Sequence, residues 1–252
     1  ERDHENAIES FELIQKEFPT DRLSVSALYQ SASSYANLDK TNESVSRYKK
    51  YIDENPKARN LERAYLNIID AYRDAANYER ALEWTNKTQD KFRGGKGEAV
   101  ALFSQVRIYL SQEDWKNALR DLSTLSGMKN LGGIRIAGGT NKAEVEFLTA
   151  YCFERLERFN DAADAYLSID DGRKNYYGGR ATHRLNALAQ NEKAAKILAQ
   201  KFDRFSAISE QTLTNSNTEE IKNAAQKALR LTADKESLDK LLARISRAYE
   251  LL

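Results

Sequence analysis

The sequence repeats itself with a period of 37 residues, and this period limits the possible folds more than any other feature. The segment Asn77–Ala81 returns as Asp114–Ala118. Further positions keep the same offset: Ala27, Ala64 and Ala101; Tyr35, Tyr72 and Tyr109; Pro19 and Pro56. A fixed period of this length is typical of a solenoid of stacked supersecondary units. Such proteins usually present an extended concave surface to a partner and do not enclose a catalytic pocket.

Apolar residues recur at intervals of three and four positions, which predicts helices, and no run alternates as a β-strand would. The predicted helices lie at 5–17, 22–37, 41–54, 58–74, 78–92, 97–111, 114–125, 142–155 and 159–168. The first range is the second helix of a unit, and the others form four helix pairs. Before the last pair the offset grows from 37 to 44 residues, because the glycine-rich segment 131–140 is inserted there.

The spacing of small and aromatic residues resembles that of the tetratricopeptide repeat (TPR) family over about residues 5–170. The family pattern has a small and an aromatic residue on the first helix, alternating aromatic and small residues on the second, and a closing proline. The second unit supplies Ala32, Tyr35, Ser44, Tyr48, Tyr51 and Pro56. The chain departs from the pattern in its period and at Thr85 and Thr88, where an aromatic and an apolar residue are usual. The resemblance implies an all-α, right-handed superhelical solenoid of antiparallel helix pairs.

The repeat pattern loosens after residue 170, so we predict a TPR-like array at 1–170 and a C-terminal helical region at 171–252 that continues the solenoid. Tyr176, Tyr177, Gly178, Arg180 and Ala181 open this region's first helix. This motif resembles one in the superhelical region of bacterial soluble lytic transglycosylases, periplasmic enzymes that cleave peptidoglycan. The alternative is that these residues simply start a helix in a tight corner.

Both ends of the sequence look cut. No methionine or signal peptide precedes residue 1, and an apolar helical stripe runs from Leu238 to Leu252 without a stop signal. We therefore expect a domain taken from a longer protein, with any catalytic domain beyond Leu252.

Composition excludes several classes of function. The net charge is +1, from 39 basic and 38 acidic residues, so nucleic acid is not an expected partner. No apolar run approaches the roughly 20 residues of a membrane span. Cys152 is the only cysteine, which rules out an internal disulfide and a cysteine-based metal site. We predict no metal and no cofactor.

The sequence shows no catalytic constellation, so we predict that this segment is not an enzyme. The only histidines, His4 and His183, are far apart in the sequence. The segment Gly133–Thr140 resembles a phosphate-binding loop, but Gly139 stands where the loop needs lysine and no strand precedes it. We interpret it as a flexible loop between repeats.

Function is therefore expected from the groove. In TPR arrays the first helix of each unit lines the concave face, and carrying the family positions over gives the candidate binding residues Tyr29, Asn37, Asp70, Arg73, Asp74, Arg107, Tyr151 and Arg155. We predict that Arg73, Arg107 and Arg155 form a basic ladder, partly neutralised by Asp70, Asp74 and Glu154. Arginine binds carboxylates bidentately, so the expected ligand is a peptide terminus or a peptidoglycan stem peptide.

Two functional hypotheses follow, with a third that is weaker. The leading one is a non-catalytic scaffold of a periplasmic lytic transglycosylase. The alternative is a free-standing TPR adaptor that mediates protein–protein interactions in a bacterial envelope assembly system, and the third is an enzyme that acts alone. A periplasmic location follows from the resemblance only. The expected partner is a protein or peptide, with peptidoglycan as a further possibility.

Overall fold

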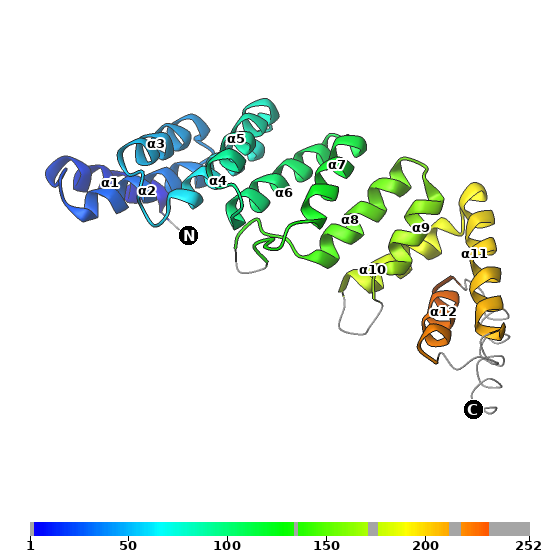
Figure 1. Ribbon diagram of the computed structural model, residues 1–252. Coiled ribbons are helices and arrows are strands. Elements are labelled where there is room, and N and C mark those ends of the chain that lie inside the picture. The colour runs from blue at the N-terminus through cyan, green and yellow to red at the C-terminus, as the bar shows by residue number, and fades with distance from the viewer. Residues whose placement is uncertain (1–2, 134–135, 171–175, 212–217, 232–252) are drawn as a thin grey trace. The chain divides into compact units, whose positions relative to one another are not determined.

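The structure is a computed structural model that describes residues 3–133, 136–170, 176–211 and 218–231. These residues form twelve helices and no β-strand, which confirms the predicted all-α class (Figure 1). The helices are α1 (His4–Glu17), α2 (Arg22–Asn37), α3 (Thr41–Glu54), α4 (Leu61–Asp74), α5 (Tyr78–Lys91), α6 (Lys96–Ser111), α7 (Trp115–Ser126), α8 (Lys142–Arg155), α9 (Phe159–Ser168), α10 (Tyr176–Leu188), α11 (Glu192–Gln211) and α12 (Thr218–Leu231). The apolar stripe predicted at 238–252 lies outside the described residues.

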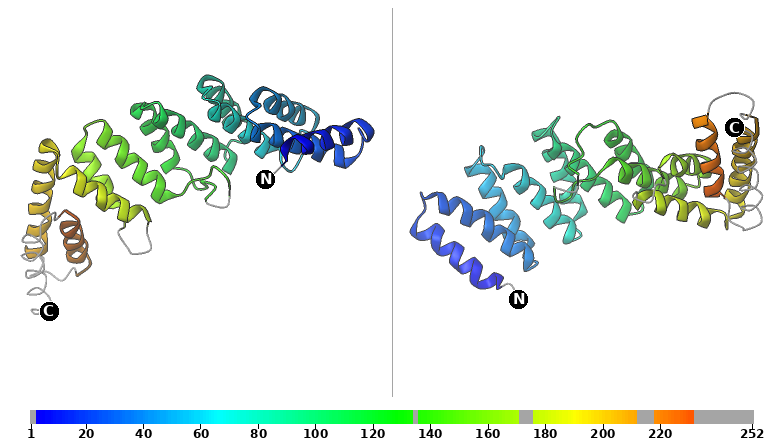
Figure 2. Two further views of the ribbon diagram at one scale, coloured as in Figure 1. Left: turned by 180° about the vertical axis from the view of Figure 1, so that it is seen from behind. Right: turned by 90° about the horizontal axis from the view of Figure 1, so that it is seen from below.

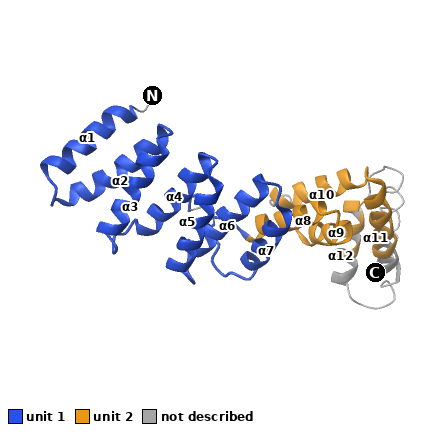
Figure 3. Ribbon diagram, turned by 90° about the horizontal axis from the view of Figure 1, so that it is seen from above, with its two compact units in different colours: residues 1–141 blue, residues 142–252 orange. Residues whose placement is uncertain are grey.

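The chain divides into two compact units, residues 1–141 and 142–252 (Figure 3). The boundary predicted at residue 170 is based on where the sequence repeats end, whereas this division is based on compact packing. The boundary at residue 170 stays a prediction. Each unit is described by itself.

Unit 1 is a stack of antiparallel helix pairs. Each helix from α1 to α6 packs on the next, and the first helices of neighbouring pairs also touch, α2 on α4 and α4 on α6 (Figure 2). Alanines at the repeat positions are almost fully buried, each at most 2% exposed: Ala27, Ala32, Ala64, Ala81, Ala101 and Ala118. Small side chains at these positions let the helices approach closely, and aromatic rings such as Tyr48 and Trp84 fill the remaining space.

The turn inside each helix pair repeats the same backbone geometry. Asp39, Ala76, Glu113 and Glu157 all have positive φ, at 56°, 54°, 57° and 55°. The residue after each donates its N–H to the carbonyl five positions back, as Lys40 does to Tyr35 at 3.0 Å. This is a Schellman helix end, in which a left-handed residue lets the last carbonyls find donors. The spacing of these turns reproduces the offsets of 37 and 44 residues seen in the sequence.

The glycine-rich segment 131–140 folds back on itself in its described part, where Gly132 and Thr140 form an isolated parallel β-bridge. Thr140 N donates to Leu131 O at 3.0 Å, and Gly133 N donates to Thr140 O at 3.0 Å. A Cβ atom on Gly139 would lie only 2.4 Å from Gly133 O, so the two arms require glycine to approach this closely. The description of this segment as a flexible loop therefore missed its internal pairing.

Unit 2 is built on α8–α12, with Phe147, Tyr166 and Leu185 in its core. Arg230 of α12 is 7% exposed and reaches the end of α9 and the start of α10. Its guanidinium donates to the carbonyls of Ile169 at 2.7 Å and Tyr166 at 3.1 Å, while its Nε donates to Thr182 Oγ1 at 2.8 Å. A cation here satisfies helix-end carbonyls and complements the negative end of the α9 dipole.

Candidate functional site

Unit 1 contains a polar hollow of about 480 Å³, which we call the α2–α4 hollow. Its walls come from α2, α3 and α4 and from the turn between α2 and α3. The lining residues are Tyr29, Ser33, Ala36, Asn37, Asp39, Thr41, Tyr48, Arg63, Asn67, Asp70, Ala71, Asp74 and Ala75. Because Tyr48 is only 1% exposed, the hollow reaches the interior of the unit.

Helical spacing explains why these side chains share one space. Tyr29, Ser33 and Asn37 follow one another at intervals of four residues, so they lie in a row along α2. Arg63, Asn67, Asp70 and Asp74 make the corresponding row along α4, at intervals of four, three and four. Since α2 and α4 are in contact, the two rows face the same space.

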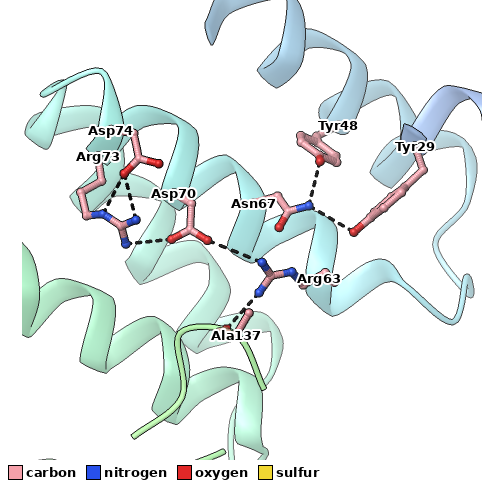
Figure 4. A network of polar contacts seen from close by, with 8 residues as sticks. All are labelled: Tyr29, Tyr48, Arg63, Asn67, Asp70, Arg73, Asp74 and Ala137. Carbon is pink, nitrogen blue, oxygen red and sulfur yellow. Dashed lines mark hydrogen bonds and ion pairs between the residues drawn. The ribbon is translucent and has the colours of Figure 1, made fainter. Parts of the chain in front are cut away.

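Asn67 connects the two walls. Its Nδ2 donates to the hydroxyl oxygens of Tyr48 at 2.7 Å and Tyr29 at 3.1 Å (Figure 4). Burial raises the pKa of Tyr29, and it raises the pKa of Tyr48 to about 12. The Tyr29 ring also packs edge-on against Tyr48 and Tyr51, with centroids 5.4 Å and 5.2 Å away. Both hydroxyls are therefore neutral at physiological pH and held in place.

A second network runs along α4 and consists of alternating charges (Figure 4). Asp70 lies between two guanidinium groups, 2.8 Å from Arg73 Nη1 and 3.8 Å from Arg63 Nη2. Arg73 also pairs with Asp74 Oδ1 at 2.9 Å, and Arg63 donates to the carbonyl of Ala137 in the glycine-rich segment at 2.9 Å. Burial opposes the charge on Arg73, but the two neighbouring carboxylates leave its pKa raised. Both arginines thus have partners inside unit 1.

Several predicted binding residues meet in this hollow: Tyr29, Asn37, Asp70 and Asp74. Arg73 is not among the lining residues, but it pairs with two of them, and its predicted neutralisation by Asp70 and Asp74 is confirmed. Arg107 lies elsewhere on α6, with its guanidinium 4.4 Å from the centroid of the Phe103 ring. Because Arg155 belongs to unit 2, the basic ladder through three helix pairs stays a prediction.

Sequence reasoning missed five polar lining side chains, those of Asp39, Thr41, Tyr48, Arg63 and Asn67. Only the family's concave positions were carried over, and neither Arg63 nor Asn67 is at one of them. The polar row at intervals of three and four along α4 is the signal that identifies both residues.

In unit 2 the structure corrects the role of Glu154. This carboxylate was predicted to neutralise the ladder, but it is 9% exposed and bonded to Arg184 of α10, whose Nε lies 3.0 Å from Oε2. Tyr166 donates to the same oxygen at 2.8 Å. Arg184 also lies over the Tyr151 ring, 5.6 Å from its centroid, and Arg155 is exposed. Glu154 therefore joins α8, α9 and α10 instead of lining a groove.

The Tyr-Tyr-Gly motif opens α10, as predicted. Tyr176 is 69% exposed, and the Arg180 guanidinium lies over both the Tyr176 ring, at 5.6 Å, and the Phe147 ring, at 4.7 Å. Burial, helped by the Glu144 carboxylate, raises the pKa of Tyr177 to about 12. Gly178 is buried, and its carbonyl accepts from Arg230 at 3.5 Å. The motif thus combines one exposed ring with a helix start that is tied to α12.

The Cys152 thiol and the placement of side chains of metal-binding types bear on reactivity in the part of the chain that the structure describes. Burial raises the pKa of the Cys152 thiol to about 12, so little thiolate forms near neutral pH. No group of three His, Cys, Asp or Glu side chains in this part of the chain is placed to hold a metal ion. Within the same ranges, every helix is too short or too polar to cross a membrane.

Comparison with known proteins agrees with the fold. Residues 26–58, which cover most of α2 and all of α3, match the tetratricopeptide repeat family model. No curated protein matches the sequence.

Solved structures of similar fold include a tetratricopeptide repeat protein from Parabacteroides merdae, with 14% identity and a TM-score of 0.54 over 96% of this chain and 92% of that one. The C-terminal part of a TPR repeat-containing protein from Cytophaga hutchinsonii has 13% identity and a TM-score of 0.54 over 94% and 93% of the two chains. The apo form of RapI has 11% identity and a TM-score of 0.58 over 95% and 71%. The architecture is therefore that of TPR-type helical repeats.

Proposed function

We propose that this protein is a TPR-like adaptor that binds a partner protein, and that an extended segment of the partner enters the α2–α4 hollow. The observation that carries the proposal is the hollow itself. It lies where side chains from the first helices of two successive repeats converge, Tyr29 and Asn37 from one and Asp70 and Asp74 from the next. Presenting a continuous binding surface from successive repeats is how solenoid proteins generally act.

The chemistry of the hollow suits a polypeptide. An extended segment needs donors and acceptors for its main chain and space for alternate side chains. Asn37, Asn67 and Ser33 supply amide and hydroxyl groups, while Tyr29 and Tyr48 supply amphipathic walls. No nucleophile or proton-transfer pair stands out among the lining residues, so we propose binding without catalysis.

Site-specific photo-cross-linking tests this function. A photoreactive side chain at Ser33 lies in the hollow, and the same group at exposed Lys50 of α3 is the matched control. In a lysate of the source organism, we expect Ser33 to form an adduct that mass spectrometry maps to one extended segment of a partner. Equal adducts from both positions would exclude the hollow as the binding site.

A second function, scaffolding of peptidoglycan cleavage by a lytic transglycosylase in the periplasm, rests on the Tyr176–Ala181 motif. The structural feature in its favour is the exposed Tyr176 ring beside Arg180, because exposed aromatic rings can stack on sugars. The comparisons favour the adaptor instead. Sedimentation with purified peptidoglycan distinguishes the two: the second function requires binding that Tyr176→Ala abolishes and that Ser33→Trp leaves unchanged.

A further inference from the structure

We propose that the α2–α4 hollow selects a basic segment of the partner, with the ammonium group of a lysine seated beside Asp74 and Asp39. This inference rests on the proposed function and adds the chemistry of the partner. It reverses the carboxylate ligand that the sequence predicts.

The net charge of the hollow favours a cationic ligand. Three carboxylates line the hollow, those of Asp39, Asp70 and Asp74, against two guanidinium groups, that of Arg63 in the lining and that of Arg73, which pairs with Asp70 and Asp74. The surplus is therefore negative. A carboxylate ligand would be repelled, whereas an ammonium group would be attracted.

The two arginines near the hollow, Arg63 and Arg73, already have partners within unit 1. Arg63 is bound to the Ala137 carbonyl and faces Asp70, and Arg73 is paired with both Asp70 and Asp74. To bind a carboxylate, either arginine would have to give up contacts that unit 1 already supplies. Asp74, by contrast, meets Arg73 through Oδ1, so its Oδ2 can accept from a ligand.

Two of the acidic side chains, those of Asp74 and Asp39, are accessible to a ligand from solvent. The Asp74 side chain is 68% exposed and Asp39 is also exposed, so both carboxylates remain at the open side of the hollow. The interior is closed by Tyr29 and Tyr48. A lysine has the matching form, since its apolar stem can pack on aromatic rings while its ammonium group stays near solvent.

Peptide binding to the intact chain tests this selectivity. The probes are a fluorescein-labelled heptapeptide Gly-Ser-Lys-Gly-Lys-Ser-Gly and its counterpart with glutamate in place of both lysines. By fluorescence anisotropy we expect the lysine peptide to bind at least about tenfold more tightly, with an affinity that falls as salt is raised. Equal binding, stronger binding of the glutamate peptide, or no binding of either peptide would overturn the proposal.

Two variants locate the effect. The double variant Asp39→Asn and Asp74→Asn keeps the shape of both side chains, and asparagine tolerates the positive φ of residue 39. We expect it to weaken the lysine peptide about fivefold to tenfold. Asp90→Asn on α5 is the control, because Asp90 is exposed, paired with Arg93 and outside the hollow. An equal loss from the control would overturn the proposal.

The two proposals fail in different ways. If cross-linking at Ser33 traps a partner segment that contains no lysine, the adaptor function stands and the selectivity for basic segments is wrong. If Ser33 and Lys50 give equal adducts, the hollow is not the binding site, and both proposals fail.

Discussion

The α4 network in unit 1, formed by Arg63, Asp70, Arg73 and Asp74, and the contacts of Arg230 in unit 2 both depend on arginine side chains. The two sets differ in how far they are exposed to solvent. In the first, the side chains of Arg73 and Asp74 are 25% and 68% exposed. In the second, Arg230 is 7% exposed and bound to main-chain carbonyls. An exposed ion pair contributes little to stability, because water competes for both partners, whereas a buried cation that loses its partners is costly. The open network therefore leaves the Asp74 carboxylate accessible to a ligand, and the buried one holds helices together.

The strongest test of this comparison is Arg230→Met. The change removes the guanidinium donor from the carbonyls of Ile169 and Leu167, and it leaves the Tyr166 carbonyl with only the Ile169 N–H at 3.3 Å. Orphaned buried acceptors cost about 1–3 kcal/mol each, so we expect a loss of about 3–5 kcal/mol in the free energy of unfolding. Urea denaturation followed by circular dichroism measures it, with Gln226→Ala on the exposed side of α12 as the control. A loss below about 1 kcal/mol would show that Arg230 is not a structural clamp.

The helices themselves could largely be predicted from the sequence. The predicted ranges 22–37, 41–54 and 142–155 agree with α2, α3 and α8 to the residue. Apolar periodicity defines the helix, and local caps define its start, as Asp21 does by accepting from Leu23 N at 2.7 Å. Local rules suffice for these features because each depends on residues that are close in sequence.

Long-range polar contacts could not be predicted in this way. Arg230 bonds to carbonyls about sixty positions earlier. Because every residue has a backbone carbonyl, the residue types do not indicate which carbonyls accept these bonds. The same reason explains why the bond from Arg63 to Ala137 was missed. Glu154 was misassigned because its helix position implied a groove, while its actual partner, Arg184, lies on a helix beyond the repeats that match the family pattern.

High pH tests whether the interior of the hollow is part of the core. The pKa of Tyr48 is about 12 in the folded state against 10 in its ordinary state, so the unfolded chain loses this proton first. The stabilisation is full below pH 10 and is lost as pH rises toward 12, by about 2–3 kcal/mol. Tyr48→Phe should flatten the fall in stability over this range in pH-dependent thermal melts. Tyr176→Phe, at an exposed site, should leave it unchanged; an identical profile for both variants would contradict the burial of Tyr48.

Packing between the helices is expected to stabilise unit 1 more than its exposed ion pairs do. Ala118 is 0% exposed on α7, which packs on α6. Ala118→Phe should overpack this contact and lower the free energy of unfolding by about 1–3 kcal/mol. Lys116→Phe adds the same ring on the exposed side of α7 and should have little effect. Similar melting temperatures for the two variants would mean that the helices separate easily here.

The smallest expected effect, and one of opposite sign, concerns a feature that both units share, the left-handed residue in the turn of each helix pair. Ala76 has a φ of 54°, which costs a residue with a Cβ atom about 1–2 kcal/mol, while glycine adopts it freely. Glycine also gives the unfolded chain more conformational entropy, which offsets part of this gain. The net effect of Ala76→Gly should be a rise of about 0.5–1 kcal/mol in the free energy of unfolding. Glu157→Gly in unit 2 should also raise the free energy of unfolding. Its gain is reduced by the loss of the exposed contact between Glu157 and Lys193. Asp39→Gly should gain less than Ala76→Gly, because aspartate tolerates this conformation better than alanine. Chemical denaturation of the three variants orders these effects, and a loss of stability in Ala76→Gly would contradict the idea that the turn is strained.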